Sequence, residues 1–258
     1  MTVAVLVQPT CQPGTDQVLV SCGDPWAGSG FALILDKNLR PAVVTPDGRA
    51  WGEGPTGQAT GNSAGGSLIV SPSDPLPVGT WSTVVATIDD PGASGAADLM
   101  FGAVRAPGSR QIRLPFTGRM ESPVLLRGEV PAADAAGLLA AGPKGKDSAR
   151  DGDGQIASDP AQASLAWWDF SVGINGWDAR DLGPSGLHGT LHNMPMRAVR
   201  GSRWDGAATN WTEAPEQYAA LHFLADALED CGWETAFTFR VPDDARSGFY
   251  AARLTAGD

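Results

Sequence analysis

Glycine and proline punctuate the whole chain and keep its regular elements short. Of the 258 residues, 33 are glycine and 20 are proline. The runs between them are rich in β-branched and aromatic residues, a pattern typical of β-strands separated by turns. The first such runs are residues 2–9, 16–23, 30–36 and 40–49. Strands at these short intervals predict an all-β sandwich.

Further β-structure is expected in the middle of the chain. Its elements are a hairpin turning at Lys37 and Asn38, a central strand over 79–90, a hairpin over 91–104 and a strand pair around Gly118 within 114–128. We expect the strand over 79–90 to lie in the interior of a sheet, because apolar residues occur on both of its alternating faces.

A single stretch, residues 131–142, predicts a helix. Pro131 suits the first helical position and Gly142 suits the end. Because the helix is short, we expect it to pack on the edge of the sandwich. Two segments are polar and glycine-rich. We expect a surface loop at 52–66 and a polar linker or long loop at 143–163.

Strands are expected again over 164–171, 181–193 and 196–201, and the composition changes near Gly206. Three more strand-like segments follow, at 216–227, 233–244 and 247–257. Three strands are too few to form a sandwich of their own, so this tail requires partner strands.

Charge and cysteine content exclude several classes of partner. The formal net charge is −11, and no stretch gathers the basic residues that nucleic acid or an anionic membrane would require. Cys11, Cys22 and Cys231 form an odd, widely spaced set without a CxxC pair, which indicates reduced thiols. The first ten residues lack the features of a secretion signal. We therefore expect a cytoplasmic protein.

His188 and His192 raise the question of a metal site, because they lie four residues apart. Neighbouring glycine, leucine and threonine favour a strand, entered by a turn over 181–186. On a strand the two imidazoles would lie about 13 Å apart, too far to share an ion. His222 has no acidic or cysteine neighbour that would complete a site. No metal site is predicted here.

Two other patterns resemble sites that carry chemistry. Asp151 and Asp153, with Asp147 upstream, are weak candidates for calcium ligands, although Gln155 and Gln162 replace the ligands of an EF-hand loop. A solvated linker is the better interpretation. The spelling of a nucleophile elbow at 61–65 lacks the strand and helix that an elbow requires, and no catalytic residue is predicted.

The chain has nine tryptophans. Alternation along a strand should direct Trp167 and Trp168 to opposite faces. Tryptophans on the surface of a sandwich can stack on sugars, whereas buried ones fill a core. Core packing is the more frequent role, but carbohydrate recognition stays open as an alternative.

Two segments, 76–89 and 114–140, resemble a laminin-G-like, concanavalin-type jelly roll. They read LPVGTWSTVVATID and LPFTGRMESPVLLRGEVPAADAAGLLA. A second and more specific resemblance begins at Leu165. The segments LAWWDFSVGINGWDARDLGPSGLHGTLHNMPMRAVRGSRWDG and WETAFTFRVPDDARSGFYAARL are similar to the large (beta) subunit of N,N-dimethylformamidases.

This resemblance implies a two-part organisation. It would place a jelly roll at residues 1–205, with 143–163 as its polar linker or loop, and a few strands of an incomplete immunoglobulin-like sandwich at 206–258. The stretch 247–250 resembles a sandwich corner, in which the Tyr250 hydroxyl bonds back to the backbone.

The family implies an iron-dependent amide hydrolase whose mononuclear iron is held by tyrosine and glutamate in a C-terminal catalytic domain. Neither Tyr218 nor Tyr250 maps onto these ligands, so no iron or other cofactor is expected in this chain and we expect it to be inactive alone. We therefore expect a non-catalytic scaffold or subunit-contact portion. Its partners would be the catalytic domain and the small subunit, with possible oligomer contacts. The alternative is a laminin-G-type module that recognises carbohydrate or another ligand.

Overall fold

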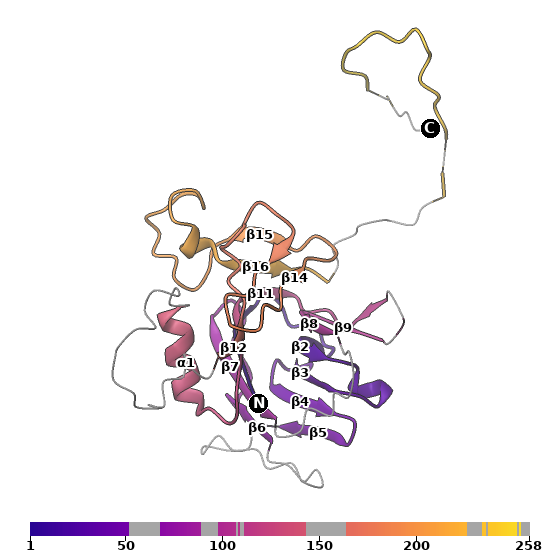
Figure 1. The fold of residues 1–258 in the computed structure, drawn as a ribbon. Helices are drawn as coiled ribbons and strands as arrows, with labels where there is room; N and C mark the ends of the chain where they lie inside the picture. The colour runs from indigo at the N-terminus through magenta and orange to yellow at the C-terminus, as the bar shows by residue number, and fades with distance from the viewer. Residues whose placement is uncertain are drawn as a thin grey trace. The chain divides into compact units, whose positions relative to one another are not determined.

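A computed structural model describes residues 1–51, 68–88, 98–106, 108, 111–142, 164–225, 234–235, 237–251 and 253. The chain divides into two compact units, Met1–Ala227 and Leu228–Asp258. The first unit holds the described strands and is mostly β-structure (Figure 1). The all-β prediction is confirmed. The boundary expected at residues 205 and 206 falls inside this first unit.

One sheet of the first unit has seven strands in the order β15-β16-β11-β1-β7-β6, with β12 also paired to β11. Its strands are β1 (Thr2–Pro9), β6 (Leu68–Ser71), β7 (Ser82–Ile88), β11 (Gly118–Leu126), β12 (Ser164–Trp167), β15 (Met196–Val199) and β16 (Ala220–Phe223). The prediction that 79–90 contains a central strand is confirmed, since β7 lies between β1 and β6.

The second sheet has five strands in the order β5-β4-β3-β2-β8. They are β2 (Gln17–Cys22), β3 (Phe31–Leu35), β4 (Pro41–Thr45), β5 (Gly48–Trp51) and β8 (Leu99–Phe101). The predicted hairpin is confirmed as β3 and β4. In its turn the Asp36 carboxylate accepts hydrogen bonds from the amides of Asn38 and Arg40, at 2.8 and 2.7 Å.

Short elements complete the described part of this unit. They are η1 (Pro25–Ala27), β9 (Val104–Arg105), β10 (Ile112–Arg113), β13 (Asp178–Ala179), β14 (Gly189–Thr190) and η3 (Pro215–Tyr218). β9 pairs with β10, and β13 pairs with β14.

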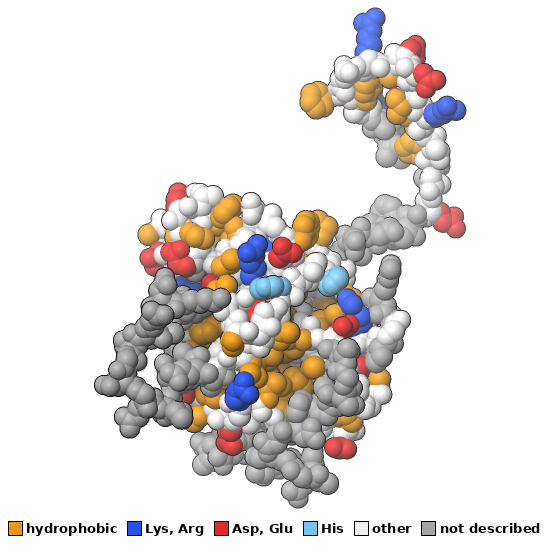
Figure 2. All heavy atoms as spheres, in the orientation of Figure 1, with side chains coloured by type: hydrophobic (Ala, Val, Ile, Leu, Met, Phe, Trp, Pro, Cys, Tyr) orange, Lys and Arg blue, Asp and Glu red, His pale blue; other side chains and the backbone are white. Residues whose placement is uncertain are grey.

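The core lies between the two sheets, as in a sandwich. Its fully buried side chains come from alternating positions of both sheets, including Val3, Val5, Val7, Leu19, Phe31, Leu33, Val84, Ala86 and Met120. Figure 2 shows hydrophobic side chains between the sheets, with histidine side chains next to them.

The predicted helix is confirmed as α1 (Ala132–Ala141), but it does not lie at the sandwich edge. It packs on the outer face of the seven-stranded sheet against β1 and β7. A second apolar cluster forms there from Leu138, Leu139, Val124, Leu126, Trp167 and their neighbours. Both faces of this sheet are therefore covered. As alternation predicted, Trp168 lies in the main core and Trp167 lies in the cluster beside α1.

Residues 114–128 differ from the expected strand pair. They form the single nine-residue strand β11, which contains a register shift where it pairs with β1. Ser122 has a φ of 51° at this shift. A bulge of this kind adds one residue without ending the strand, and it changes which residues face the core. In a regular strand, two residues five positions apart face opposite sides. The bulge between Met120 and Leu125 lets both side chains reach the main core.

The hairpin expected over 91–104 falls partly outside the described residues. Its described part separates into two strands with different partners, since β8 pairs with β2 and β9 pairs with β10. The loop expected at 52–66 and the linker expected at 143–163 lie outside the described residues.

The tail differs from the expected set of three strands. Residues 216–227 contain β16, which pairs with β11 and β15 in the main sheet. The described residues of 234–253 form no strand, and Phe237 and Phe239 are 61% and 72% exposed. A strand requires a neighbour for its backbone hydrogen bonds, and within the described residues this segment has none. The expected corner bond is confirmed, because the Tyr250 hydroxyl donates to the Arg246 carbonyl at 2.5 Å.

Candidate ligand pocket

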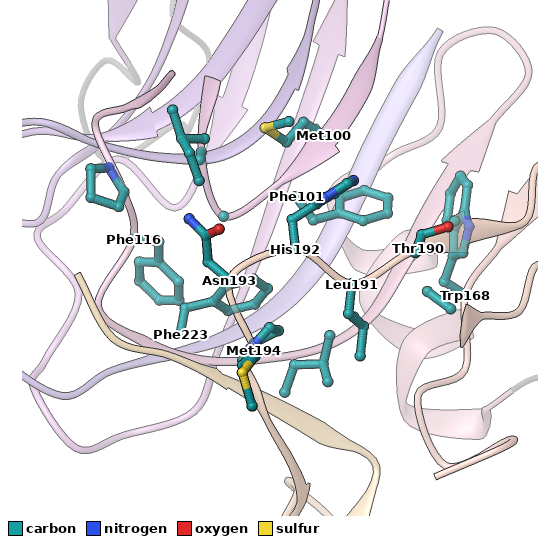
Figure 3. Close-up of a pocket in the computed structure, with 18 of the residues that line it drawn as sticks. Met100, Phe101, Phe116, Trp168, Thr190, Leu191, His192, Asn193, Met194 and Phe223 are labelled. Carbon is teal, nitrogen blue, oxygen red and sulfur yellow. The ribbon is translucent and has the colours of Figure 1, made fainter. Parts of the chain in front are cut away.

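A pocket of about 600 Å³ opens between β8, β16 and the segment 187–195. Most of its lining is apolar. The lining includes Met100, Phe101, Phe116, Trp168, Phe170, Leu187, Leu191, Met194, Leu221 and Phe223, with the polar residues His188, Thr190, His192 and Asn193 (Figure 3). Volume and lining lie within the usual range of small-molecule sites.

Two aromatic pairs form the walls of this pocket. Phe101 and Trp168 meet edge to face, with ring centroids 4.8 Å apart, and the tilted rings of Phe116 and Phe223 are 6.3 Å apart. Gly102 permits this arrangement, because a Cβ at that position would lie 2.6 Å from the Phe223 ring. Gly102 also has a φ of 78°, which other residues rarely adopt.

The segment that borders the pocket is organised by the buried carboxylate of Asp181. Its Oδ1 accepts hydrogen bonds from the amides of Trp167 and Gly183, at 2.8 and 2.7 Å, and its Oδ2 accepts one from the Leu187 amide at 2.7 Å. The indole of Trp168 donates to the Leu187 carbonyl at 2.7 Å. The bonds from Gly183 and Leu187 close the turn over 181–187, and those of Trp167 and Trp168 tie it to the end of β12.

His188 is oriented by the same turn. Its Nδ1 accepts a hydrogen bond from the Asp181 amide at 3.2 Å. His188 lines the pocket.

His192 and Asn193 come from the loop that follows β14. Figure 3 shows the His192 side chain projecting towards Phe101 of β8 and the Asn193 side chain projecting from the same side of the loop, nearer to Phe116 in this view, whereas Leu191 and Met194 project the other way. Asn193 has a φ of 56°, a conformation that asparagine tolerates better than most residues. The loop therefore places an imidazole and a carboxamide beside the aromatic wall.

His222 contributes differently. Its neighbours Leu221 and Phe223 belong to or pack against the main core, so alternation directs the imidazole to the other face of β16. There His222 pairs in register with Arg119 of β11. Burial, and then the charge of Arg119, lower the pKa of His222. All three histidines belong to the lining of this pocket.

The expected turn over 181–186 is confirmed, but the histidine-bearing strand that should follow it is much shorter than expected. Only Gly189 and Thr190 are in a strand, and the two bonds from the Gly183 and Leu187 amides to the Asp181 carboxylate hold the preceding residues in a compact turn. Among the described residues, no group of three His, Cys, Asp or Glu side chains lies close enough to hold a metal ion. Asp147, Asp151 and Asp153 lie outside the described residues, as does Cys231, so the calcium prediction stays a prediction. Cys11 and Cys22 are free thiols.

Two further polar groups, the buried Glu121 and the half-buried Arg197, hold the 197–203 segment in place. Glu121 has a side chain only 1% exposed; it accepts a hydrogen bond from the Ser202 amide at 2.7 Å and lies 3.7 Å from the Arg203 guanidinium. Burial raises the pKa of Glu121, an effect that these two partners partly offset. Arg197 donates to the carbonyls of Phe170, Val172, Gly176 and Asp178, and burial lowers the pKa of its guanidinium.

Sequence patterns indicated the histidines but missed the residues that shape the pocket. Phe101, Trp168 and Phe223 come from segments that meet only in the folded sandwich. A partial signal exists for Asp181, because Asp followed two residues later by glycine is typical of a side-chain-capped turn.

Fold and pocket together define the class of protein: an all-β sandwich with an open, largely aromatic pocket, and with no membrane-spanning helix among its described residues. A family model described as "N,N-dimethylformamidase beta subunit-like, C-terminal" matches residues 196–258. The chain is 33% identical over 193 residues to the N,N-dimethylformamidase beta subunit of Paracoccus aminophilus, covering 71% of this chain and 23% of that protein. It is 43% identical over 99 residues to that of an Alcaligenes species, covering 36% of this chain and 13% of that protein.

The chain is therefore an N,N-dimethylformamidase beta-subunit-like protein. The matches span less than a quarter of the length of either relative.

Proposed function

We propose that this chain is a non-catalytic β-sandwich portion of an N,N-dimethylformamidase-like amide hydrolase, serving as scaffold or subunit-contact surface. The observation that carries this proposal is the 33% identity over 193 residues to a protein named as a beta subunit. A protein so named works beside other subunits, so contact with partners is part of the proposal. We propose the catalytic part and the small subunit of such an enzyme as the partners.

The described residues do not fit the iron site that the resemblance implies. The Tyr218 hydroxyl is buried and donates to the Ala208 carbonyl at 2.9 Å. The Tyr250 hydroxyl donates to the Arg246 carbonyl. The buried Glu121 is engaged by Ser202 and Arg203. We therefore place the iron chemistry of the proposed enzyme outside the described residues of this chain.

Exposed apolar residues in 237–250 support a contact role. Phe237, Phe239, Val241, Phe249 and Tyr250 are all well exposed. Phe237, Phe239 and Val241 alternate along the chain, as the inward-facing positions of a strand would. Burying them against a partner would remove this apolar surface from water.

Two measurements on the purified chain test the proposal. The first is amine release from N,N-dimethylformamide, with and without added iron, and we expect none. The second is size-exclusion chromatography after co-expression with the small subunit of a dimethylformamidase, where we expect co-elution. Amine release by the chain alone, or separate elution of the two proteins, would contradict the proposal.

The alternative of carbohydrate recognition stays a prediction. Glycan binding, or a melting temperature that rises with calcium, would favour it over the scaffold role.

A further inference from the structure

We propose that the pocket between β8, β16 and residues 187–195 binds a small, uncharged molecule with an aromatic body and one polar group. This binding site goes beyond the scaffold role, which requires no ligand. Three properties of the pocket carry the inference: its apolar walls, its two projecting polar side chains and its balanced charge.

The walls determine the body of the ligand. Phe101, Phe116, Trp168 and Phe223 line about 600 Å³ of space together with leucine and methionine side chains. Edge-to-face and offset contacts with such rings favour another aromatic ring over an aliphatic chain of equal area. The volume accommodates two or three fused or linked rings.

His192 and Asn193 determine the polar group. Both residues line the pocket, and their side chains project from the same side of the loop (Figure 3). A carboxamide both donates and accepts hydrogen bonds, and a neutral imidazole does the same through its two nitrogens. A ligand with one N–H, hydroxyl or carbonyl group would be satisfied at this end of the pocket.

The charge balance favours a neutral ligand over an ionic one. Among the described lining residues other than histidines, the ionisable side chains are Asp98 and Arg105, which form an ion pair of 3.7 Å with each other. A charged ligand would leave water for a largely apolar site without an opposite charge to receive it, at a high cost in free energy. The ligand is therefore neutral.

The pocket is held open by bonds that need no ligand. Asp181 and the Trp168 indole fix residues 181–187 through four hydrogen bonds. A preformed site loses little conformational entropy when it binds.

Fluorescence titration with N-phenyl-1-naphthylamine tests the proposal. This probe is neutral, has an aromatic body and carries one N–H group. Because the exposed tail could also bind it, the parent protein for the titration carries Phe237→Ser and Phe239→Ser. We expect saturable binding with one probe per chain.

Three variants of that parent locate the binding. His192→Trp places a larger ring beside Phe101 and should abolish saturable binding. Asn193→Gly removes the carboxamide but keeps the left-handed backbone, and should weaken binding about 3- to 10-fold through the lost hydrogen bond. Trp177→Ala removes an exposed aromatic side chain outside the pocket lining and should change the affinity less than about twofold.

Circular dichroism melting establishes that each variant is folded. The proposal is overturned if the parent shows no saturable binding, if a folded His192→Trp variant binds like the parent, or if Asn193→Gly binds with unchanged affinity. If His192→Trp fails to fold, the comparison of Asn193→Gly with Trp177→Ala still decides the outcome.

Discussion

At the scale of single residues, the buried carboxylates determine how the loops attach to the sheets. Asp181 and Glu121 are both almost fully buried, yet they act differently. Asp181 is surrounded by backbone amides, which complement its charge. Glu121 has fewer partners, and its Oε1 lacks a hydrogen bond among the described residues. The effect of removing the Asp181 carboxylate should therefore differ measurably from the effect of removing the Glu121 carboxylate.

Replacing Asp181 with alanine should lower the free energy of unfolding by about 3 kcal/mol. Three backbone amides, those of Trp167, Gly183 and Leu187, would lose their acceptor, and the Trp167 amide is buried. Urea denaturation measures the change. Asp205→Ala is the matched control, since the exposed Asp205 caps only the Ala207 amide and should cost less than about 1 kcal/mol. Equal losses in the two variants would contradict this role.

Glu121 should make stability depend on pH. Burial raises its pKa in the folded state above the unfolded value, so the folded protein binds more protons in the range between the two pKa values. Stability from this group is fully present below the unfolded pKa and is lost as the pH rises through the folded pKa. Because the glutamine in Glu121→Gln cannot ionise, the stability of this variant should not fall in the same way as the pH rises.

Urea denaturation at pH 5, 6, 7 and 8 tests this pH dependence. The free energy of unfolding of Glu121→Gln, relative to the unsubstituted chain, should increase with pH. A difference that stays constant over this range would show that Glu121 does not titrate differently on folding.

At the scale of elements, the loop over 170–178 depends on Arg197, which lies in β15. The guanidinium donates to four carbonyls of this loop. Lysine has a single, compact donor group and cannot reproduce this planar fork. Arg197→Lys should therefore destabilise the protein by about 2 kcal/mol and should speed amide exchange at Val172 and Gly176.

Hydrogen exchange monitored by mass spectrometry measures this local loosening. Arg180→Lys is the control, because Arg180 is exposed and its replacement should change stability by less than about 0.5 kcal/mol. Unchanged exchange in the 170–178 loop of Arg197→Lys would contradict the clamping role.

At the scale of the whole molecule, the two compact units should differ in resistance to proteolysis. The described residues of 234–253 have exposed backbone without strand pairing, whereas the first unit buries two apolar clusters around its main sheet. Exposed segments without secondary structure are cleaved first. Brief trypsin treatment should cut after Arg240, Arg246 and Arg253, and mass spectrometry should show that the bonds after Arg119 in β11 and Arg197 in β15 stay intact over the same time. Early cleavage after Arg119 or Arg197 would contradict this division.

Much of the fold could be predicted, because local patterns carry the necessary information. The alternation in 2–9, the turn at Lys37 and Asn38, and the limits of α1 all depend on neighbours a few residues away. The placement of α1 could not be predicted. An outer sheet face with Val124, Leu126 and Trp167 needs cover, and this face exists only once β1, β7, β11 and β12 are paired.

Local sequence patterns were enough to predict that this chain is β-rich, that Trp167 and Trp168 face opposite ways, that a turn covers 181–186, and that the chain resembles dimethylformamidase beta subunits. The folded chain was needed to show that β16 belongs to the main sheet and that the histidines line one pocket. It was also needed to show that the Asp181 carboxylate organises the turn. Periodicity and turn chemistry act between near neighbours, whereas strand partners and pockets join residues such as Phe101, Trp168 and Phe223, which are far apart in the chain.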